Sequence, residues 1–293
     1  MGIMEFGGTS YHIDNKLLKF WKKYSLEYID HTNTDRFYIV DGRERSGKST
    51  WAIQQACALD PSLKDLKVFL SRICFSPEDF DRACKEVRNG VIIFDEAFRG
   101  LSARSALSKT NRKLITTLME MGQNNNIVFL ILPSFFMLDT YPAMLRSNAL
   151  FNIYIDKKTG KRTFRGFNYN DKNRIYQQGV RKGWNYFMRT KFKGRFYENR
   201  EHTKFPGGKR FYNAYEAKKR RALRDRKDEI EKVKEDKYMI QRDLIIKGLY
   251  KDYLPMYTKV ARWLNKHGIK ISDDTIRNII KNTGKDGEKP KTE

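Results

Sequence analysis

The chain has 293 residues, with 59 Lys or Arg against 35 Asp or Glu, and a formal net charge of +24 at pH 7. This length suits one full α/β core with something smaller attached, and the positive surplus attracts polyanions, nucleic acid first and an anionic membrane surface second. No apolar run approaches the roughly 20 residues of a membrane span. No secretory signal is visible, and three widely spaced cysteines exclude a disulfide framework and a zinc knuckle, so we expect a cytoplasmic protein.

Residues 1–35 are predicted to form an N-terminal helical segment. Between residues 16 and 26, apolar side chains recur at helical spacing with basic side chains between them. The apolar side is expected to lean on a sheet. The lysines either form a solvated face or contact nucleic acid or a membrane.

Residues 42–50 fit the phosphate-binding loop pattern of Gly, four residues, Gly, Lys, then Ser or Thr. A strand is predicted before the loop, at 36–41, and a helix after it, at 49–58, which is the order that the motif requires. Lys48 is expected to hold the β- and γ-phosphates, and Ser49 to ligate magnesium. The alternative is a plain glycine turn. The predicted nucleotide-binding residues are Gly42, Arg43, Glu44, Arg45, Ser46, Gly47, Lys48, Ser49 and Thr50.

Strand and helix signals alternate after the loop, which favours a parallel sheet. Residues 66–70 are predicted to be a strand, and a capped helix is expected to begin at Ser76. Residues 91–94 are four large apolar residues followed by Asp95 and Glu96. These acids emerge at the carboxyl end of a buried strand, where α/β sheets bind ligands.

The two acids have distinct expected roles. Asp95 is predicted to hold magnesium with Ser49, and Glu96 to act as the general base. The expected catalytic residues are therefore Lys48, Asp95 and Glu96, with ATP and Mg²⁺ as cofactors. A helix N-terminal cap is the alternative role for the acidic pair.

The paired motifs resemble those of P-loop ATPases of the additional-strand, catalytic-glutamate division. Within it, residues 35–155 most resemble the HerA, FtsK and zonula-occludens-toxin-like ATPases of viruses, plasmids and mobile elements. The resemblance implies an α/β three-layer sandwich with a mainly parallel sheet over residues 36–156. It also implies a homo-oligomer, with a ring as one of its forms. A viral member would work in the host cytoplasm.

The resemblance also implies a polar sensor after the next strand and an arginine that reaches a neighbouring nucleotide. The sensor candidates are Gln123, Asn124, Asn125 and Ser134. The arginine candidates are Arg99, Arg104, Arg112 and Arg146, each of which is otherwise an ordinary surface residue.

The composition changes after residue 156. From 157 to 226 there are 23 Lys or Arg and five Asp or Glu, with aromatic residues interleaved. Residues 157–211 are predicted to form a small basic β-rich appendage that contacts single- or double-stranded DNA. Alternatively, its aromatic residues form the core of a β-meander and its lysines keep it soluble. The DNA-binding candidates here are Trp184, Tyr186, Lys191, Lys193 and Arg195.

The remaining chain is predicted to be helical. Residues 212–239 form a helical linker, residues 240–282 a trihelical helix-turn-helix module, and residues 283–293 a disordered tail. The module's predicted core is Val260, Leu264, Ile269, Ile276 and Ile280. Thr275, Arg277, Asn278 and Lys281 are expected to face a major groove, and protein docking is the alternative role for the module.

These features favour a magnesium-dependent ATPase that acts on DNA as an oligomeric motor or assembly ATPase of a virus or mobile element. Genome packaging, DNA translocation and virion assembly all fit. The alternative is a nucleotide-switched, site-specific DNA-binding protein that recruits others in replication, partition or transposition. A small-molecule kinase fits the loop but leaves the charge and the trihelical end unexplained.

Overall fold

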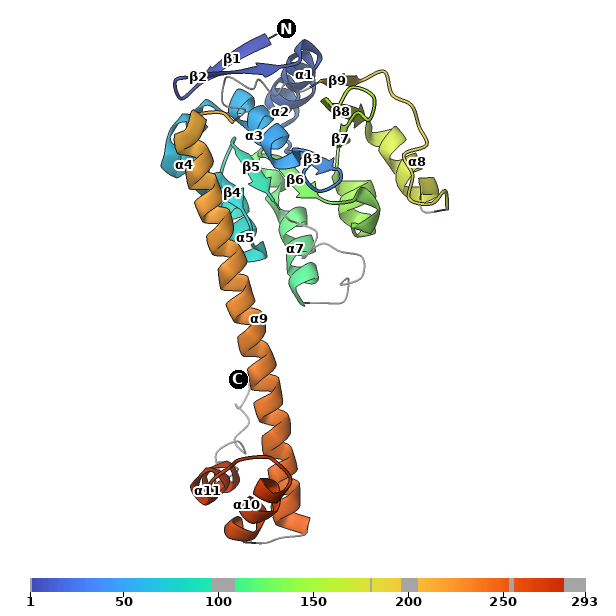
Figure 1. Cartoon of the computed structure of the whole chain (residues 1–293). Helices are drawn as coiled ribbons and strands as arrows, with labels where there is room; N and C mark the ends of the chain where they lie inside the picture. Colours follow the sequence, from blue (N-terminus) through green and yellow to red (C-terminus); the bar gives the residue numbers. More distant parts are fainter. Residues whose placement is uncertain (1, 96–108, 180, 196–204, 253–255, 282–293) are drawn as a thin grey trace. The chain divides into compact units, whose positions relative to one another are not determined.

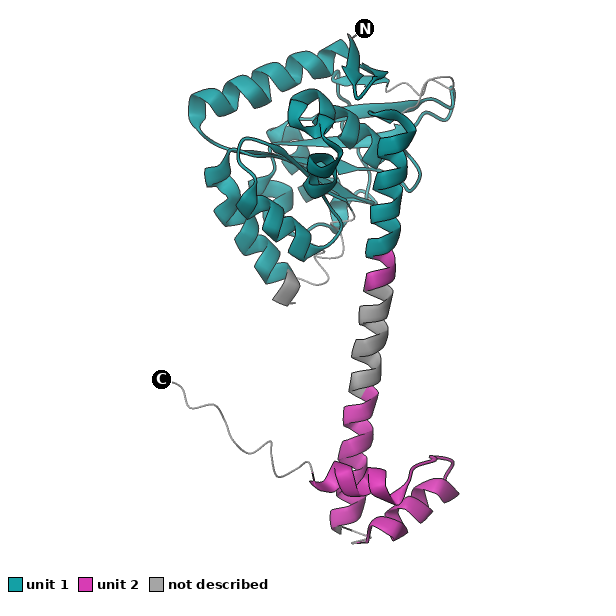
Figure 2. Cartoon of the chain, turned by 90° about the vertical axis from the view of Figure 1, so that its left-hand side faces the viewer, with its two compact units in different colours: residues 1–222 teal, residues 223–293 magenta. Residues whose placement is uncertain are grey.

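The structure is a computed structural model, and it describes residues 2–95, 109–179, 181–195, 205–252 and 256–281 (Figure 1). The chain divides into two compact units, residues 1–222 and residues 223–293 (Figure 2). Helix α9 (Gly208–Asp252) contributes residues to both units.

A seven-stranded sheet forms the centre of the first unit, in the order β4-β5-β6-β3-β7-β8-β9. The five strands from β4 to β7 are parallel, and β8 and β9 are antiparallel. The strands are β3 (Arg36–Asp41), β4 (Ile73–Cys74), β5 (Val91–Phe94), β6 (Ile127–Leu132), β7 (Ala149–Ile155), β8 (Arg162–Phe167) and β9 (Lys193–Arg195). Strand β6 lies between β3, which precedes the phosphate loop, and β5, which precedes Asp95.

Helices cover both faces of this sheet. The apolar side chains of β5 and β6 point to both faces and are buried along the whole length of these strands, so both faces need a covering layer. One face packs against α1 (Asn15–Trp21), α3 (Lys48–Leu59), α4 (Leu66–Arg72) and the start of α9. The other packs against α5 (Pro77–Glu86), α7 (Lys109–Glu120) and α8 (Tyr169–Gly179). The predicted α/β architecture with a mainly parallel sheet is therefore confirmed.

The N-terminal segment contains a hairpin as well as helices. Strands β1 (Gly2–Phe6) and β2 (Thr9–Ile13) pair antiparallel around Gly7 and Gly8, whose φ angles of 55° and 77° suit a tight hairpin turn. After α1, a π-helical turn and α2 (Glu27–Thr32) lead to the sheet. Only the helical part of residues 1–35 was predicted.

The strand predicted at residues 66–70 is wrong: these residues begin helix α4. The carboxylate of Asp65 accepts hydrogen bonds from the backbone N–H groups of Lys67 (2.7 Å) and Val68 (3.1 Å), which caps the helix. The sheet instead gains the two-residue strand β4, directly after the helix.

Residues 157–211 do not fold apart from the sheet. Strand β8 pairs with β7 along its whole length, and β9 pairs with β8. The aromatic side chains of this segment extend the cores on both faces: Phe164 joins one core and Phe167 the other. The alternation of residue types over 184–192 favoured strands, but these residues are not in a strand. Strands β8 and β9 lie on either side of them in the sequence and complete the central sheet.

The second unit has a small core of its own. The end of α9 packs against α10 (Tyr257–Lys266) and α11 (Asp273–Lys281), and the buried residues are Ile246, Val260, Ala261, Leu264, Ile276 and Ile279. Two predicted core residues differ. Ile269 follows the helix-ending Gly268 and is 45% exposed, and Ile280 is only partly buried, because Ile276 and Ile279 share the inner face of α11 at i, i+3 spacing.

None of the described helices combines the length and the apolar character needed to cross a bilayer.

Candidate nucleotide site

The phosphate loop joins the carboxyl end of β3 to the amino end of α3, as predicted. Gly42 has a φ of 146°, and a Cβ atom there would lie 2.0 Å from the carbonyl oxygen of Ile153, so only glycine fits. Gly47 has a φ of 95° and is the N-cap of α3. The loop therefore brings backbone N–H groups and the positive end of a 12-residue helix to one place, which suits a phosphate.

Lys48 is folded back on its own loop. Its ammonium donates hydrogen bonds to the carbonyl oxygens of Gly42 (2.7 Å) and Arg43 (2.9 Å). Burial lowers the pKa of Lys48, while the carboxylates of Asp41 and Asp95 act in the opposite direction. A phosphate would offer this ammonium stronger acceptors than the two carbonyls.

Asp95 lies at the carboxyl end of β5 and is 3% exposed. Its Oδ2 atom accepts a hydrogen bond of 2.7 Å from the hydroxyl of Tyr215 and lies 3.6 Å from the ammonium of Lys219. Tyr215 also bonds to the side chain of Ser49, and burial raises the pKa of its phenol, so the hydroxyl stays protonated as a donor. One tyrosine on α9 thus contacts both predicted magnesium ligands.

These groups line one cavity of about 870 Å³. Lys48, Ser49 and Asp95 share it with Arg162 at the start of β8 and with Tyr212 of α9. The Ser49 hydroxyl and the Asp95 carboxylate are hard oxygen donors of the kind that Mg²⁺ prefers. The residues present therefore fit a magnesium ion and a polyphosphate. Glu96, the predicted base, lies outside the described residues.

A second polar network lies behind the loop. Asp41 is 1% exposed and accepts hydrogen bonds from Asn152 (2.9 Å), the backbone N–H of Phe135 (3.0 Å) and the hydroxyl of Tyr186. Arg165 donates to Asn152 (2.9 Å). Burial is the largest effect and raises the pKa of Asp41 to about 6. This network ties the residue before Gly42 to three other segments and so fixes the loop's entry.

The sensor candidates separate into two places. Ser134 follows β6 and lines a cavity with Asp41 and Gly42, at the loop edge of the sheet. Gln123, Asn124 and Asn125 precede β6, whose six residues span about 20 Å. They therefore lie at the opposite edge of the sheet, where Asn124 donates to the carbonyl of Cys84, and they are too far from the loop to contact a phosphate there.

The arginine candidates are also divided. Arg146 forms an ion pair with Asp35 and donates to the carbonyl of Leu118 (2.7 Å). Asp35 lies just before the amino end of β3, so the charge of Arg146 is paired at the edge of the sheet opposite the phosphate loop. Arg112 is exposed on α7. Arg99 and Arg104 lie outside the described residues.

The DNA-binding candidates differ in exposure. Trp184 is 47% exposed. Lys193 and Arg195 are exposed on β9, and Lys191 is exposed two residues before it. Tyr186 is half-buried, with its hydroxyl bonded to Asp41. Within the second unit, α11 exposes all four of its candidates, Thr275, Arg277, Asn278 and Lys281.

The contribution of α9 to the cavity was not predicted. Tyr212, Tyr215 and Lys219 belong to a run dense in Ala, Lys, Arg and Glu that resembles any exposed helix. The only local signal is that Phe211 and Tyr215 stand four residues apart and so share one helix face.

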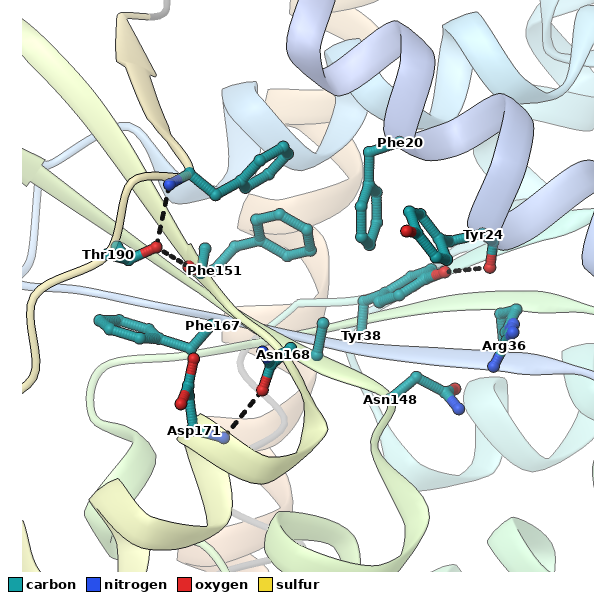
Figure 3. A pocket seen from close by; sticks show the side chains of 13 residues that line it. Phe20, Tyr24, Arg36, Tyr38, Asn148, Phe151, Phe167, Asn168, Asp171 and Thr190 are labelled. Atoms are coloured by element: carbon teal, nitrogen blue, oxygen red, sulfur yellow. Dashed lines mark hydrogen bonds between the residues drawn. The ribbon is translucent and has the colours of Figure 1, made fainter.

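A smaller cavity of about 350 Å³ lies near the amino ends of β3 and β7 (Figure 3). Aromatic rings, among them Phe20, Tyr24 and Phe151, line one side, and Asn168 and Asp171 lie on the other (Figure 3). Polar groups that line this cavity bond to one another, as in the 2.9 Å hydrogen bond from the backbone N–H of Asp171 to the side chain of Asn168. It is remote from the phosphate loop and is not part of the nucleotide site.

No protein-family model and no curated protein matches the sequence. Among solved structures, the N-terminal domain of zonular occludens toxin from Neisseria meningitidis is similar, with 16% identity, a TM-score of 0.39, and coverage of 57% of this chain and 96% of that one. The genome packaging NTPase B204 from Sulfolobus turreted icosahedral virus 2, in complex with AMPPCP, has 16% identity, a TM-score of 0.33, and coverage of 47% and 94%. B204, the DNA-packaging ATPase from Sulfolobus Turreted Icosahedral Virus, has 15% identity, a TM-score of 0.28, and coverage of 44% and 80%.

Proposed function

We propose that the protein is a magnesium-dependent ATP hydrolase that acts on DNA as an oligomer. The observation that carries this proposal is the cavity of about 870 Å³ in which Lys48, Ser49 and Asp95 meet. A phosphate-binding loop in the strand–loop–helix context and an acid from a second parallel strand are the parts that such hydrolases need.

Each residue has a role in this proposal. The loop's backbone N–H groups hold phosphate oxygens, and Lys48 exchanges its bonds to two carbonyls for bonds to the β- and γ-phosphates. Ser49 and Asp95 hold the magnesium ion, which when bound neutralises charge on the phosphate oxygens. Glu96 accepts a proton from the attacking water.

The charge distribution supports DNA as the partner. Residues 157–226 carry 23 basic and five acidic side chains, and Lys191, Lys193 and Arg195 are exposed on one short segment. Trp184 offers a half-exposed ring for stacking on a base, whereas the Tyr186 hydroxyl is bonded to Asp41. As an oligomer, with a closed ring as one of its forms, such a chain would serve genome packaging, DNA translocation or virion assembly.

A second candidate function is a nucleotide-switched protein that marks a DNA site and recruits others. The observation that favours it is α11, whose Ile276 and Ile279 are buried while Thr275, Arg277 and Asn278 are exposed beside them. A short amphipathic helix that closes a trihelical unit is the form of a major-groove reader.

ATP hydrolysis with and without magnesium tests the first proposal. Lys48→Ala should impair nucleotide binding, and Glu96→Gln should bind ATP but hydrolyse it about 100- to 10,000-fold more slowly. Hydrolysis at the wild-type rate by Glu96→Gln would show that the acidic pair is structural.

Imaging the protein with DNA and a non-hydrolysable ATP analogue separates the two functions. A closed ring around DNA supports the motor. A filament, or single copies at fixed positions on the DNA, supports the switch.

A further inference from the structure

The start of α9 is fixed against the sheet unit from two directions. Phe211 packs edge-on against Phe6 (ring centroids 5.6 Å apart) and Phe69 (5.1 Å). Lys218 donates to the carbonyl oxygens of Leu70 (2.7 Å) and Ile73 (2.6 Å) near the end of α4. The first turns of α9 therefore lie beside α4 (Figure 1). They hold the side chains of Tyr212, Tyr215 and Lys219 at the cavity.

Lys219 is the cation that α9 places there. Its ammonium lies 3.6 Å from Oδ2 of Asp95 and 3.5 Å from the hydroxyl of Tyr215, and its side chain is 26% exposed. In the part of the chain that the structure describes, Lys48 and Lys219 are the lysines that line this cavity. The positive charge of Lys219 is near enough to Lys48 to contribute to lowering its pKa.

The pairing of Lys219 with Asp95 depends on what else is bound. A magnesium ion held by Ser49 and Asp95 would neutralise the Asp95 charge and weaken its attraction for the ammonium. The terminal phosphate of ATP would then be the strongest acceptor within the same cavity. ADP lacks the γ-phosphate.

We propose that Lys219 recognises the γ-phosphate in cis and thereby distinguishes ATP from ADP. Tyr215 is a positioning residue in this arrangement, because its hydroxyl bonds to both Asp95 and Ser49. The inference rests on the proposed ATP hydrolysis. Lys219 acts on the nucleotide of its own chain, whereas the expected arginine would reach a neighbouring nucleotide.

The test compares Lys219→Met with Arg220→Met, which removes the same charge from the next, exposed position of α9. Equilibrium binding of a non-hydrolysable ATP analogue and of ADP, both with magnesium, is the main measurement. Lys219→Met should weaken binding of the analogue by about tenfold to a hundredfold, the contribution of a hydrogen bond to a charged group, and leave ADP binding unchanged. Lys219→Arg should keep most of the preference, and Arg220→Met should match the wild type.

Two outcomes would overturn the proposal. Equal losses for the analogue and for ADP would show that Lys219 acts on the site in general, and binding equal to that of Arg220→Met would show that it has no role. If Lys219→Met fails to fold, Lys219→Gln carries the same expectation. A wild-type protein that binds neither nucleotide would contradict the proposed function itself, which is a different result.

Discussion

Asp41 is predicted to make the free energy of unfolding fall as the pH rises toward neutrality. Burial raises the pKa of Asp41 from 3.8 to about 6, against the hydrogen bonds from Asn152 and Phe135 and the charges of Arg165 and Lys48. An acid with a higher pKa in the folded state binds more protons when folded, so its stabilisation is complete below about pH 3.8 and is lost as the pH rises through about 6. A difference of about two pKa units corresponds to about 3 kcal/mol.

Asp41→Asn removes the titration while keeping the shape of the side chain. Urea unfolding of both proteins should be measured from about pH 4 to 8, and the difference in unfolding free energy, wild type minus variant, should fall by about 2.5 kcal/mol over this window, because a small part of the effect is already lost at pH 4. Asp30→Asn, at an exposed position, is the control for the loss of a carboxylate. A difference that stays constant with pH would refute the argument that burial controls Asp41.

Three further predictions follow from the described contacts. Tyr215→Phe loses the bonds to Asp95 and Ser49 and should lower the free energy of unfolding, measured in urea, by about 1–3 kcal/mol. Tyr212→Phe, in the same cavity, should lower it less. Equal losses would show that the hydrogen bonds of the Tyr215 hydroxyl do not stabilise the fold. Replacing Lys191, Lys193 and Arg195 by Gln should reduce the salt dependence of duplex DNA binding by about 0.9 per phosphate contact in the slope of log affinity against log salt. The matched control replaces the exposed Lys19, Lys22 and Lys23. Equal slopes for both triple variants would mean that only the total charge of the protein matters for DNA binding, and not the position of these residues. Arg277→Ala should lower selectivity in a mixed DNA pool by about 1–3 kcal/mol, whereas the exposed Lys270→Ala should not, and unchanged enrichment would leave protein docking as the module's role.

The parallel strands could be predicted from sequence because their signals are local. The four apolar residues of β5 and the six of β6 can be buried on both faces only inside a sheet, and the phosphate loop fixes the register of the chain around β3. The same local rule failed at residues 66–70, where Leu, Val, Phe and Leu surround one lysine and no period is clear. The side chain of Asp65 caps these residues and thereby stabilises a helix. The hairpin at Gly7 and Gly8 carried a usable turn signal that was missed.

The candidate site was predictable only in part, for a physical reason. Lys48, Ser49 and Asp95 belong to motifs whose spacing reflects the strand and loop that carry them. Tyr215 and Lys219 reach the cavity because a helix more than 100 residues later packs back on the sheet, through Phe211 against Phe6 and Phe69. Such tertiary packing leaves no fixed spacing to the motifs, so the residues look like ordinary members of a charged helix.

This packing gives a last prediction, on where the first unit ends. The linker was expected to start at residue 212, yet Phe211 and Tyr215 are each 4% exposed within the sheet unit. Each aromatic side chain buries about 150–250 Å², so at about 25 cal/mol per Å² the pair contributes on the order of 10 kcal/mol of apolar burial, an upper value that is comparable with the whole stability of a domain.

A chain that ends at Gly207 should therefore unfold or aggregate, whereas one that ends at Lys237 should fold and bind nucleotide like the full chain. Thermal unfolding and nucleotide binding of the two truncated proteins measure this directly. If the shorter chain were as stable as the longer one, the packing of α9 on the first unit would not contribute to the stability of that unit. If the longer chain failed to bind nucleotide, residues beyond 237 would have to belong to the site, and the division of the chain at residue 222 would not separate two independent functions.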